Sequence, residues 1–362
     1  MFSDTVVVIG GGPGGLRAAH GIAGTGNRAV LIEQRDYLGG TPVAEKYSGL
    51  TPRGEPAAPQ IQHLVDSVTA DPLTEVRLGT EVVALDGEPG AFTVTLRRAQ
   101  GSGAEAVGDQ TVECGAVVIA TGFGHFDPSR ATQMYGYFEF PDVITQAELE
   151  LMLSEHRVLR PSNGQPPERI CFVQCVGSRD RQIGNEYCSK VCCGVASKEA
   201  IEIRQLLPSS KVFIFYIDMR TYGYWENEIY WPAQEQHHVQ YVKGLITEVL
   251  PKGDRLLVRG EDTTMGRPME VLMDLVVLSV GMEPSTGTRD LAKLLGVRQN
   301  KYGFIEATGA PLDPVSTNRE GVFACGAALG PADLEDTVSS AAGAALKAVG
   351  YLRPRPVATA KA

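Results

Sequence analysis

The N-terminal stretch of the chain limits its fold most narrowly. Thr5–Ile9 is an unbroken apolar run, glycines follow at Gly10, Gly12 and Gly15, and a run of small residues, Leu16–Ala23, comes next. An apolar strand that passes through G-x-G-x-x-G into a helix is typical of a dinucleotide-binding unit. The first glycine permits a tight turn, the second lets the backbone approach a pyrophosphate, and the third lets helix and strand pack closely. The amides at the start of the helix then face the phosphates.

The next residues extend this interpretation. Arg28–Ile32 is expected to be the second strand, and Glu33 stands at its end, where an acid binds a ribose 2′-hydroxyl. Gly39 and Gly40 precede Thr41 shortly afterwards. A second glycine pair favours the longer cofactor FAD over NAD, because that cofactor needs another close backbone approach. The alternative is a plain turn.

Two later segments are expected to return to the same cofactor. Residues 116–124 are an apolar strand that ends in Thr-Gly, although such a strand can also simply stop at glycine. Residues 321–326 form a short strand with a glycine turn, and residues 332–348 are rich in alanine and follow a proline. This helix is expected to point its positive end at a flavin ring near Asp336 and Thr337.

A cysteine-rich stretch lies in the middle of the chain. CFVQC indicates a buried strand, and a helix is predicted from Asn185 to Leu207, before a proline. Cys188 and Cys192 would share a face of that helix, with Cys193 beside them and Cys175 approaching from the strand end. Four converging sulfurs suit an iron–sulfur cluster or structural zinc. A redox disulfide and four packed thiols remain as alternatives.

This stretch occupies the place of a second glycine motif. The loop after the strand reads CVGSR, residues 175–179, so no nicotinamide site is expected. The predicted fold class is α/β, with two Rossmann-like dinucleotide-binding domains of the FAD/NAD-linked reductase type. The second domain, residues 164–280, would be inserted in a discontinuous FAD-binding domain of residues 1–163 and 281–362. Within the first, residues 146–156 are expected to form an exposed helix.

Composition narrows the class of protein further. The chain has 362 residues and a formal net charge of −10, so it carries no basic footprint for nucleic acid. No run of 18 apolar residues is present, and the first strand is expected at Thr5, which leaves no room for a signal peptide. Seven cysteines on this spacing favour a reducing, cytoplasmic compartment. Cys114, Cys171 and Cys325 lie on apolar strands and are expected to be buried and inert.

The order of these motifs resembles the flavoproteins with two dinucleotide-binding domains. More narrowly, QCVGSRD…YCSKVCCGVASKEA…FIFYIDMR resembles heterodisulfide reductase in its flavin-carrying HdrA component. The resemblance implies that Cys175, Cys188, Cys192 and Cys193 hold a [4Fe–4S] cluster beside FAD. It also implies that Lys198 lies close to the flavin ring. The methanogen form carries ferredoxin-type C-x-x-C-x-x-C runs, which this sequence lacks, so it looks more like the short HdrA-like component of the heterodisulfide-reductase-like complex of sulfur-oxidising bacteria.

The resemblance implies an electron-transfer flavoprotein whose partners are other subunits of such a complex, and a homodimer. An NAD(P)H-dependent disulfide reductase and a structural scaffold are the alternatives. Ala327 stands where many relatives place an Asp on the ribityl chain, so another group is expected to bind there. The residues expected to bind FAD are Gly10, Gly12, Pro13, Gly14, Gly15, Glu33, Gln34, Arg35, Gly40, Thr41, Val83, Ala120, Thr121, Gly122, Gly326, Ala327, Asp336 and Thr337.

Overall fold

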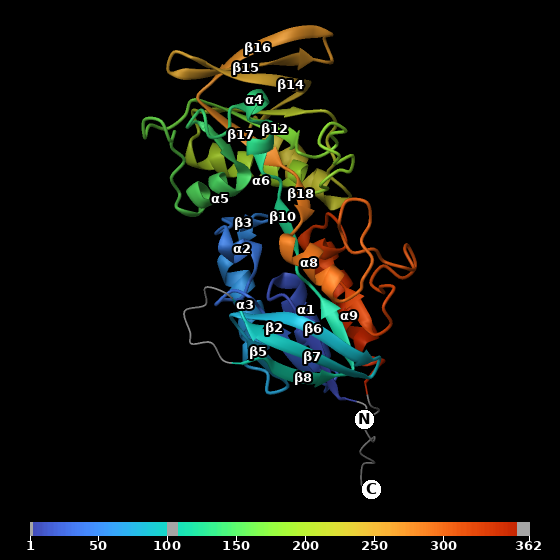
Figure 1. The fold of residues 1–362 in the computed structure, drawn as a ribbon. Coiled ribbons are helices and arrows are strands. Elements are labelled where there is room, and N and C mark those ends of the chain that lie inside the picture. The colour runs from blue at the N-terminus through green and yellow to red at the C-terminus, as the bar shows by residue number, and fades with distance from the viewer. Residues whose placement is uncertain (1–2, 100–107, 353–362) are drawn as a thin grey trace. The chain divides into compact units, whose positions relative to one another are not determined.

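A computed structural model of the chain describes residues 3–99 and 108–352. Its contacts divide the chain into two compact α/β units (Figure 1). The first unit comprises Met1–Gly40, Ile61–Gly124 and Pro284–Ala362, and the second comprises Thr41–Gln60 and His125–Glu283. Residues 41–60 and 125–163 therefore group with the second unit, whereas the sequence pattern had placed them in the first.

The first unit is built on a parallel sheet of five strands. Its order is β19 (Val322–Ala324), β9 (Ala116–Ile119), β1 (Thr5–Ile9), β2 (Arg28–Ile32) and β5 (Thr74–Arg77). The three central strands are buried almost throughout, which explains their continuous apolar sequence.

Different elements cover the two faces of this sheet. Helices α1 (Pro13–Gly24) and α9 (Leu334–Val349) pack together on one face, and α3 (Ala57–Thr69) contributes Val68 to the same core. The antiparallel strands β6 (Thr80–Glu88), β7 (Ala91–Arg98) and β8 (Gln110–Cys114), together with α8 (Thr286–Leu294), cover the other. With both faces covered, only the strand ends are open to a ligand.

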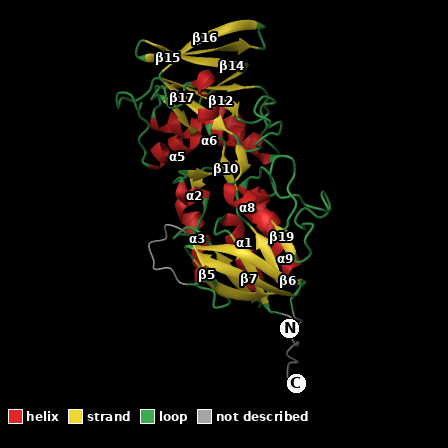
Figure 2. Cartoon of the chain, in the orientation of Figure 1, coloured by secondary structure: helices red, strands yellow, loops and turns green. Residues whose placement is uncertain are grey.

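The second unit has a sheet of seven strands (Figure 2). Its order is β11 (Val143–Thr145), β17 (Leu275–Val280), β12 (Arg169–Val176), β13 (Lys211–Tyr216), β14 (Gln240–Lys252), β15 (Arg255–Asp262) and β16 (Arg267–Met273). The first five strands are parallel, and the last two continue antiparallel. The sequence pattern did not indicate β16, which contains Pro268, a residue that sheets tolerate at an edge.

Helices α5 (Gln146–Ser154) and α6 (Cys192–Leu206) pack on one face of this sheet. The other described elements are short: α2 (Thr41–Ala44), β3 (Gly49–Leu50), β4 (Glu55–Pro56), β10 (Phe123–His125), a 3-10 turn (Pro128–Ala131), α4 (Thr132–Tyr135), a π-helical turn (Glu226–Tyr230), α7 (Trp231–Glu235), β18 (Met282–Pro284) and a 3-10 turn (Gly326–Ala328).

Two of the predicted helices are wrong in part. The helix predicted from Asn185 begins only at Cys192, so Cys188 lies in the preceding loop. Lys190 adopts a left-handed φ of 65°, and the Ser189 hydroxyl accepts a hydrogen bond from the Met282 amide at 2.8 Å, so this segment follows tertiary contacts rather than a helical path. The helix expected to be exposed at residues 146–156 is half buried, because Leu149 and Leu153 enter the core.

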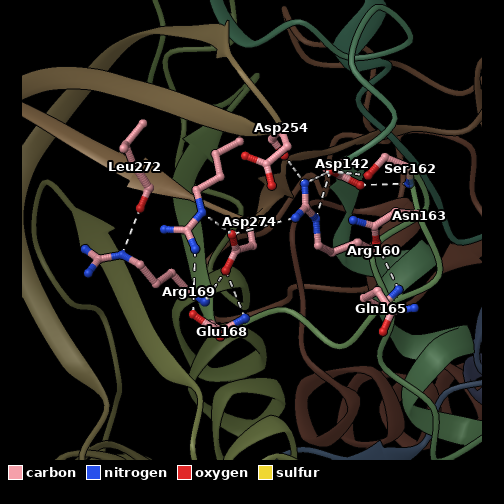
Figure 3. Close-up of polar contacts among 11 residues, drawn as sticks. Asp142, Arg160, Ser162, Asn163, Gln165, Glu168, Arg169, Asp254, Leu272 and Asp274 are labelled. Atoms are coloured by element: carbon pink, nitrogen blue, oxygen red, sulfur yellow. Dashed lines mark hydrogen bonds and ion pairs between the residues drawn. The ribbon is translucent and has the colours of Figure 1, made fainter.

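Buried ion pairs close the amino end of the second sheet (Figure 3). Arg160 donates to Asp142 at 2.9 Å and also reaches Asp274, which accepts the backbone amides of Glu168 and Arg169 at 2.9 and 2.8 Å. The side chains of Arg160, Asp142 and Asp274 are at most 8% exposed. Asp142 and Asp274 immediately precede β11 and β17, so one guanidinium fixes the start of three strands.

Replacing Arg160 with Met should destabilise the second unit. The substitution leaves Asp142 buried without its cation, whereas Asp274 keeps Arg255 at 3.1 Å, and removing one partner of a buried pair costs about 3–5 kcal/mol. Urea unfolding monitored by circular dichroism measures this loss. Arg97→Met, which removes the exposed partner of Asp109, is the matched control and should change the free energy of unfolding far less. Equal effects of the two substitutions would contradict the assigned role.

Candidate functional site

The glycine loop of the first unit has the close contacts that the motif predicts. Gly10 has a φ of 113°, and a Cβ at Gly15 would lie 1.7 Å from the Gly10 carbonyl oxygen. Pro13 begins α1, and no side chain caps its N-terminus at Gly12 within the part of the chain that the structure describes. The first amides of α1 are therefore available to an anionic group such as a pyrophosphate.

Glu33 is buried and holds this loop. Its carboxylate accepts hydrogen bonds from the amides of Gly11 at 2.6 Å and Arg35 at 2.8 Å. The Gly39 amide donates to the Gly11 carbonyl at 2.9 Å, and Gly40 has a left-handed φ of 62°. The second glycine pair therefore lies against the first. A carboxylate oxygen has two lone pairs, so Glu33 keeps the capacity to bind a ribose hydroxyl.

Three more segments of the first unit meet the loop at the same edge of the sheet. A Cβ at Gly14 would lie 3.2 Å from Thr337 Cγ2, and one at Gly326 would lie 2.9 Å from the same atom. Gly10 approaches the Ala120 carbonyl, and the Thr121 hydroxyl contacts Thr288 at 2.7 Å. The carboxyl ends of β1, β9 and β19 thus bring together most of the residues expected to bind FAD, as expected for an α/β sheet.

The remaining expected residues have other positions. Gln34 and Arg35 are exposed, Ala327 is buried, and Gly122 has a φ of 68°. Asp336 takes part in the capping box of α9, where its amide donates to Asp333 at 2.7 Å. Val83 lies at the bulge in β6, and Thr41 begins α2 in the second unit.

The cysteine site lies at the carboxyl end of β12 in the second unit. Cys175 is on the strand, Cys192 and Cys193 begin α6, and Cys188 lies in the loop between them. Burial raises the pKa of Cys192 well above its ordinary value, and the neighbouring charges of Cys193, Cys175 and Cys188 raise it further. Burial also raises the pKa of Cys193 to about 12, with contributions from Cys175 and Cys188. All four thiols are therefore within electrostatic range of one another.

The backbone around these thiols is unusual. Cys175, Arg179 and Lys190 have positive φ values of 66°, 57° and 65°, a conformation that costs free energy for residues other than glycine. The Lys190 amide donates to the Cys188 sulfur at 3.3 Å. Such strain persists only where the surrounding structure enforces it, and it gathers at functional sites.

Two arginines lie beside the thiols. Arg179 and Arg220 both bind the carboxylate of Asp218, and the carbonyl of Asp218 lies 3.9 Å from the Cys193 sulfur. Burial raises the pKa of Cys175, while the charge of Arg179 and a hydrogen bond from it act in the opposite direction. The charge of Cys188 helps raise the pKa of Arg220. The sequence pattern did not single out either arginine, although Arg179 stands within the quoted QCVGSRD segment.

The four cysteines offer a single kind of donor. Within residues 3–99 and 108–352, no three His, Cys, Asp or Glu side chains are arranged to hold one metal ion. Thiolates are ligands both of structural zinc and of iron–sulfur clusters. The all-cysteine donor set is therefore chemically suited to either centre, and iron and sulfide content would distinguish the two.

Lys198 lies on α6 in a buried ionic group. Its ammonium donates to the Ser48 hydroxyl and the Gly49 carbonyl, both at 3.2 Å, and to Glu150 at 2.5 Å. Although burial opposes its charge, Glu150 and Glu202 raise the pKa of Lys198. The predicted contact of Lys198 with a flavin ring stays a prediction. Glu150 was not anticipated, because only the fold brings α5 against α6.

The three other cysteines are buried, as predicted. Cys114, Cys171 and Cys325 are at most 1% exposed, and burial raises the pKa of Cys114 and Cys325 to about 12. Their thiols stay protonated at neutral pH and are poor nucleophiles. No described helix is long and apolar enough to cross a membrane.

Comparisons with known proteins agree with this architecture. Residues 4–159 match the family model described as pyridine nucleotide-disulphide oxidoreductase. The chain is 39% identical over 243 residues to the HdrA component of the H(2):CoB-CoM heterodisulfide,ferredoxin reductase of Methanothermobacter thermautotrophicus, covering 66% of this chain and 37% of that protein. It is 30% identical to an iron-sulfur HdrA component of the CoB–CoM heterodisulfide reductase of Methanopyrus kandleri, covering 98% of this chain and 65% of that protein. The chain thus spans between about a third and two thirds of these relatives.

Solved structures support the fold. Thioredoxin reductase of T. acidophilum superposes with a TM-score of 0.64 at 17% identity, covering 96% of this chain and 99% of that one. The thioredoxin reductase of Lactococcus lactis gives 0.62 at 16% identity, covering 97% and 99%. These two structures support the fold alone, whereas the family match and the relatives above are those of oxidoreductases and favour FAD as the cofactor.

Gly15→Val should abolish cofactor binding by the first unit. The new Cβ would overlap the Gly10 carbonyl, so the loop must open, and we expect most bound FAD to be lost together with more than about 4 kcal/mol of stability. Flavin absorbance per chain and the melting temperature measure both effects. Gly24→Ala is the control, since a Cβ at Gly24 meets nothing within 4 Å. Full flavin content in Gly15→Val would contradict the assigned loop.

Proposed function

We propose that this chain is an electron-transfer flavoprotein subunit that passes electrons between FAD and a [4Fe–4S] cluster. The cluster would be held by Cys175, Cys188, Cys192 and Cys193. The wider setting that we propose is a heterodisulfide-reductase-like complex of sulfur oxidation in the cytoplasm. FAD exchanges two electrons and a cluster exchanges one at a time, so together they can connect two-electron and one-electron chemistry.

The observation that carries this proposal is the gathering of four thiols at one sheet edge. Their mutual electrostatic influence, the burial of Cys192 and Cys193 and the strained backbone around them support a shared ligand. Thiolate ligands are the soft donors that iron–sulfur clusters use. Arg179 and Arg220 add positive charge nearby, which would stabilise the anionic thiolates.

The glycine loop supports the proposal that the first unit binds FAD. The amides of α1 would bind the pyrophosphate of FAD, and Glu33 would orient the adenosine ribose while it holds Gly11. Thr337, at the start of α9, would lie beside the isoalloxazine end, where a helix N-terminus favours negative charge. Lys198 would supply a cation to the same ring.

The relatives' names support the proposed partners. They are components of heterodisulfide reductases, which are complexes of several subunits, so other subunits of a related complex are the proposed electron donors and acceptors. The sulfur-oxidation setting and a homodimer are inferred from the resemblance of the cysteine segment. The loop after β12 has cysteines in place of a glycine motif, which favours protein partners over a nicotinamide as the redox partner.

Iron analysis tests the cluster directly. Protein purified without oxygen should contain about four irons and four acid-labile sulfides per chain and give an EPR signal after dithionite reduction. Cys175→Ala should lose most of this iron and sulfide, because one ligand is missing. Cys171→Ala is the matched control, since Cys171 lies on the same strand within the apolar core, and it should keep its iron.

Three outcomes would overturn the proposal. Zinc, or no metal, in the anaerobic protein would remove the proposed relay from flavin to cluster. Rapid bleaching of the flavin by NADH, with no electron passing to iron, would favour an NAD(P)H-dependent disulfide reductase instead. A flavin that dithionite reduces without any cluster signal would favour a scaffold.

A further inference from the structure

A row of polar side chains crosses the carboxyl ends of β11, β17 and β12. Leu278 of β17 pairs with the last residue of β11 on one side and with Val173 of β12 on the other. Gln146, Ser279 and Gln174 are the next residues of the three segments. All three are buried, at 8%, 0% and 7% exposure. The row lies at the same edge of the sheet as Cys175, in the second unit.

Several atoms in this row have no protein partner. Among the described residues, both amide atoms of Gln174, the hydroxyl of Ser279 and one carboxylate oxygen of Glu199 are buried without a hydrogen bond. Buried polar groups are almost always satisfied, and where protein atoms do not do so, ordered water does. Four such atoms in one region therefore indicate internal water.

Strand geometry directs these atoms toward α6. Phe172 packs with Ala196 and Ala200 of α6 in one core cluster. On β17, Leu275 and Val277 belong to the same cluster, and side chains alternate along a strand, so Ser279 faces this side as well. Gln174 lies where the pairing of β12 with β17 shifts its register, between Val173 and Val176. Glu199 lies next to Ala200 and accepts a hydrogen bond from Gln146 at 3.1 Å. The unpartnered oxygen of Glu199 is therefore on the side of the sheet where the row lies.

Glu199 lies within electrostatic range of a second carboxyl. Burial and the charge of Glu150 raise the pKa of Glu199 well above its ordinary value, although Lys198 and Gln146 act in the opposite direction. The Glu199 carboxyl accepts a hydrogen bond from the neutral amide of Gln146, and burial disfavours its charged form. Glu150 accepts hydrogen bonds from the Lys198 ammonium and from the Ser48 amide and hydroxyl, the last two at 2.8 and 2.7 Å. These donors stabilise the negative charge of Glu150. A proton is therefore favoured on Glu199.

We propose that the buried Glu199 holds a proton beside the charged Glu150, and that water ordered by Gln146, Ser279 and Gln174 connects this proton to the cysteine edge. This pair is a site for a proton and internal water, separate from the flavin and thiol sites. The charged and titratable groups placed against it are Lys198 and Glu202 from α6, and Tyr47 with Glu45 from the segment before β3.

The position of the pair gives it a use in electron transfer, a step that rests on the proposed function. Glu199 follows Cys192 by seven residues on α6, which is roughly 10 Å along a helix. At that distance and an effective dielectric constant of about 20, one charge changes a protonation equilibrium by roughly tenfold. An electron delivered to the cysteine site by reduced flavin or a partner subunit thus lets Glu199 keep its proton to a higher pH, and the proton favours the electron by the same factor.

Glu199→Gln tests the proton without any cofactor chemistry. The amide is neutral, can accept from Gln146 and can donate to Glu150, so it imitates a protonated Glu199. A carboxyl whose folded pKa is raised gives stability below its unfolded pKa, and this stability is lost as pH rises toward the folded value. Above about pH 4.3, the unfolding constant of the natural protein should therefore rise relative to that of the variant by up to about tenfold per pH unit.

Urea unfolding of the full chain between pH 4 and pH 8 measures this ratio. Glu235→Gln, at an exposed position on α7, is the control and should leave the ratio constant. An infrared carbonyl band of a protonated carboxyl, shifted in deuterated water, should be present in the natural protein and absent from Glu199→Gln. If the variant does not fold, the presence or absence of this band in the natural protein decides whether a protonated carboxyl is present. A constant ratio or a missing band would overturn the proton site.

The coupling to electron transfer has its own measurement. The midpoint potential of the EPR-active group should fall with rising pH in the natural protein and depend less on pH in Glu199→Gln. If the unfolding and infrared data show the proton but the midpoint potential depends equally on pH in both proteins, the coupling is wrong and the proton site stands. Absence of any iron signal would instead overturn the proposed function, while unfolding and infrared data would still report on the proton.

Discussion

Burial of both faces of a parallel sheet is the constraint on which the rest of this structure depends. In each unit the central strands are apolar along most of their length, and helices or further strands cover both faces. Polar side chains can then enter only at the strand ends. In the second unit the amino ends carry the ionic group of Arg160, Asp142 and Asp274, whereas the carboxyl ends carry the thiols and the row of Gln146, Ser279 and Gln174. The amino ends therefore hold the strands in place, and the carboxyl ends carry the candidate reactive groups.

The glycine loop was predictable because its contacts are local in sequence. Gly15 packs against Gly10, which lies only five residues before it. Glu33, at the end of the next strand, accepts a hydrogen bond from the Gly11 amide, so a short motif specifies the whole turn. Most strands of both sheets were predictable for the same reason, since continuous apolar runs mark parallel strands that are covered on both faces. Helix boundaries were harder to predict where tertiary contacts decide them. Near Cys188, the Ser189 hydroxyl accepts a hydrogen bond from the Met282 amide and the Lys190 amide donates to the Cys188 sulfur, so no helical turn forms there.

The buried charges could not be predicted in the same way. Lys198 was singled out by the resemblance of its segment to a known family, but Glu150 lies 48 residues away and Ser48 150 residues away. A sequence pattern gives no sign that α5 and α6 bring these groups together. Once buried, they depend on one another, because an unpaired ammonium or carboxylate in the interior is far more costly than a paired one. Because Lys198 is paired with Glu150, the hydrogen bond that Glu199 accepts comes from the neutral amide of Gln146, and burial raises the pKa of Glu199.

Charge balance around the thiols favours an anionic occupant. Burial alone would keep Cys192 and Cys193 as neutral thiols at physiological pH. Arg179 and Arg220 share the single carboxylate of Asp218, which leaves one positive charge more than Asp218 neutralises. Thiolates bound to a metal cluster would supply negative charge where these guanidinium groups lie, whereas four neutral thiols would not. The two arginines and the four cysteines are therefore easiest to understand as parts of one site, with Asp218 holding both guanidinium groups toward it.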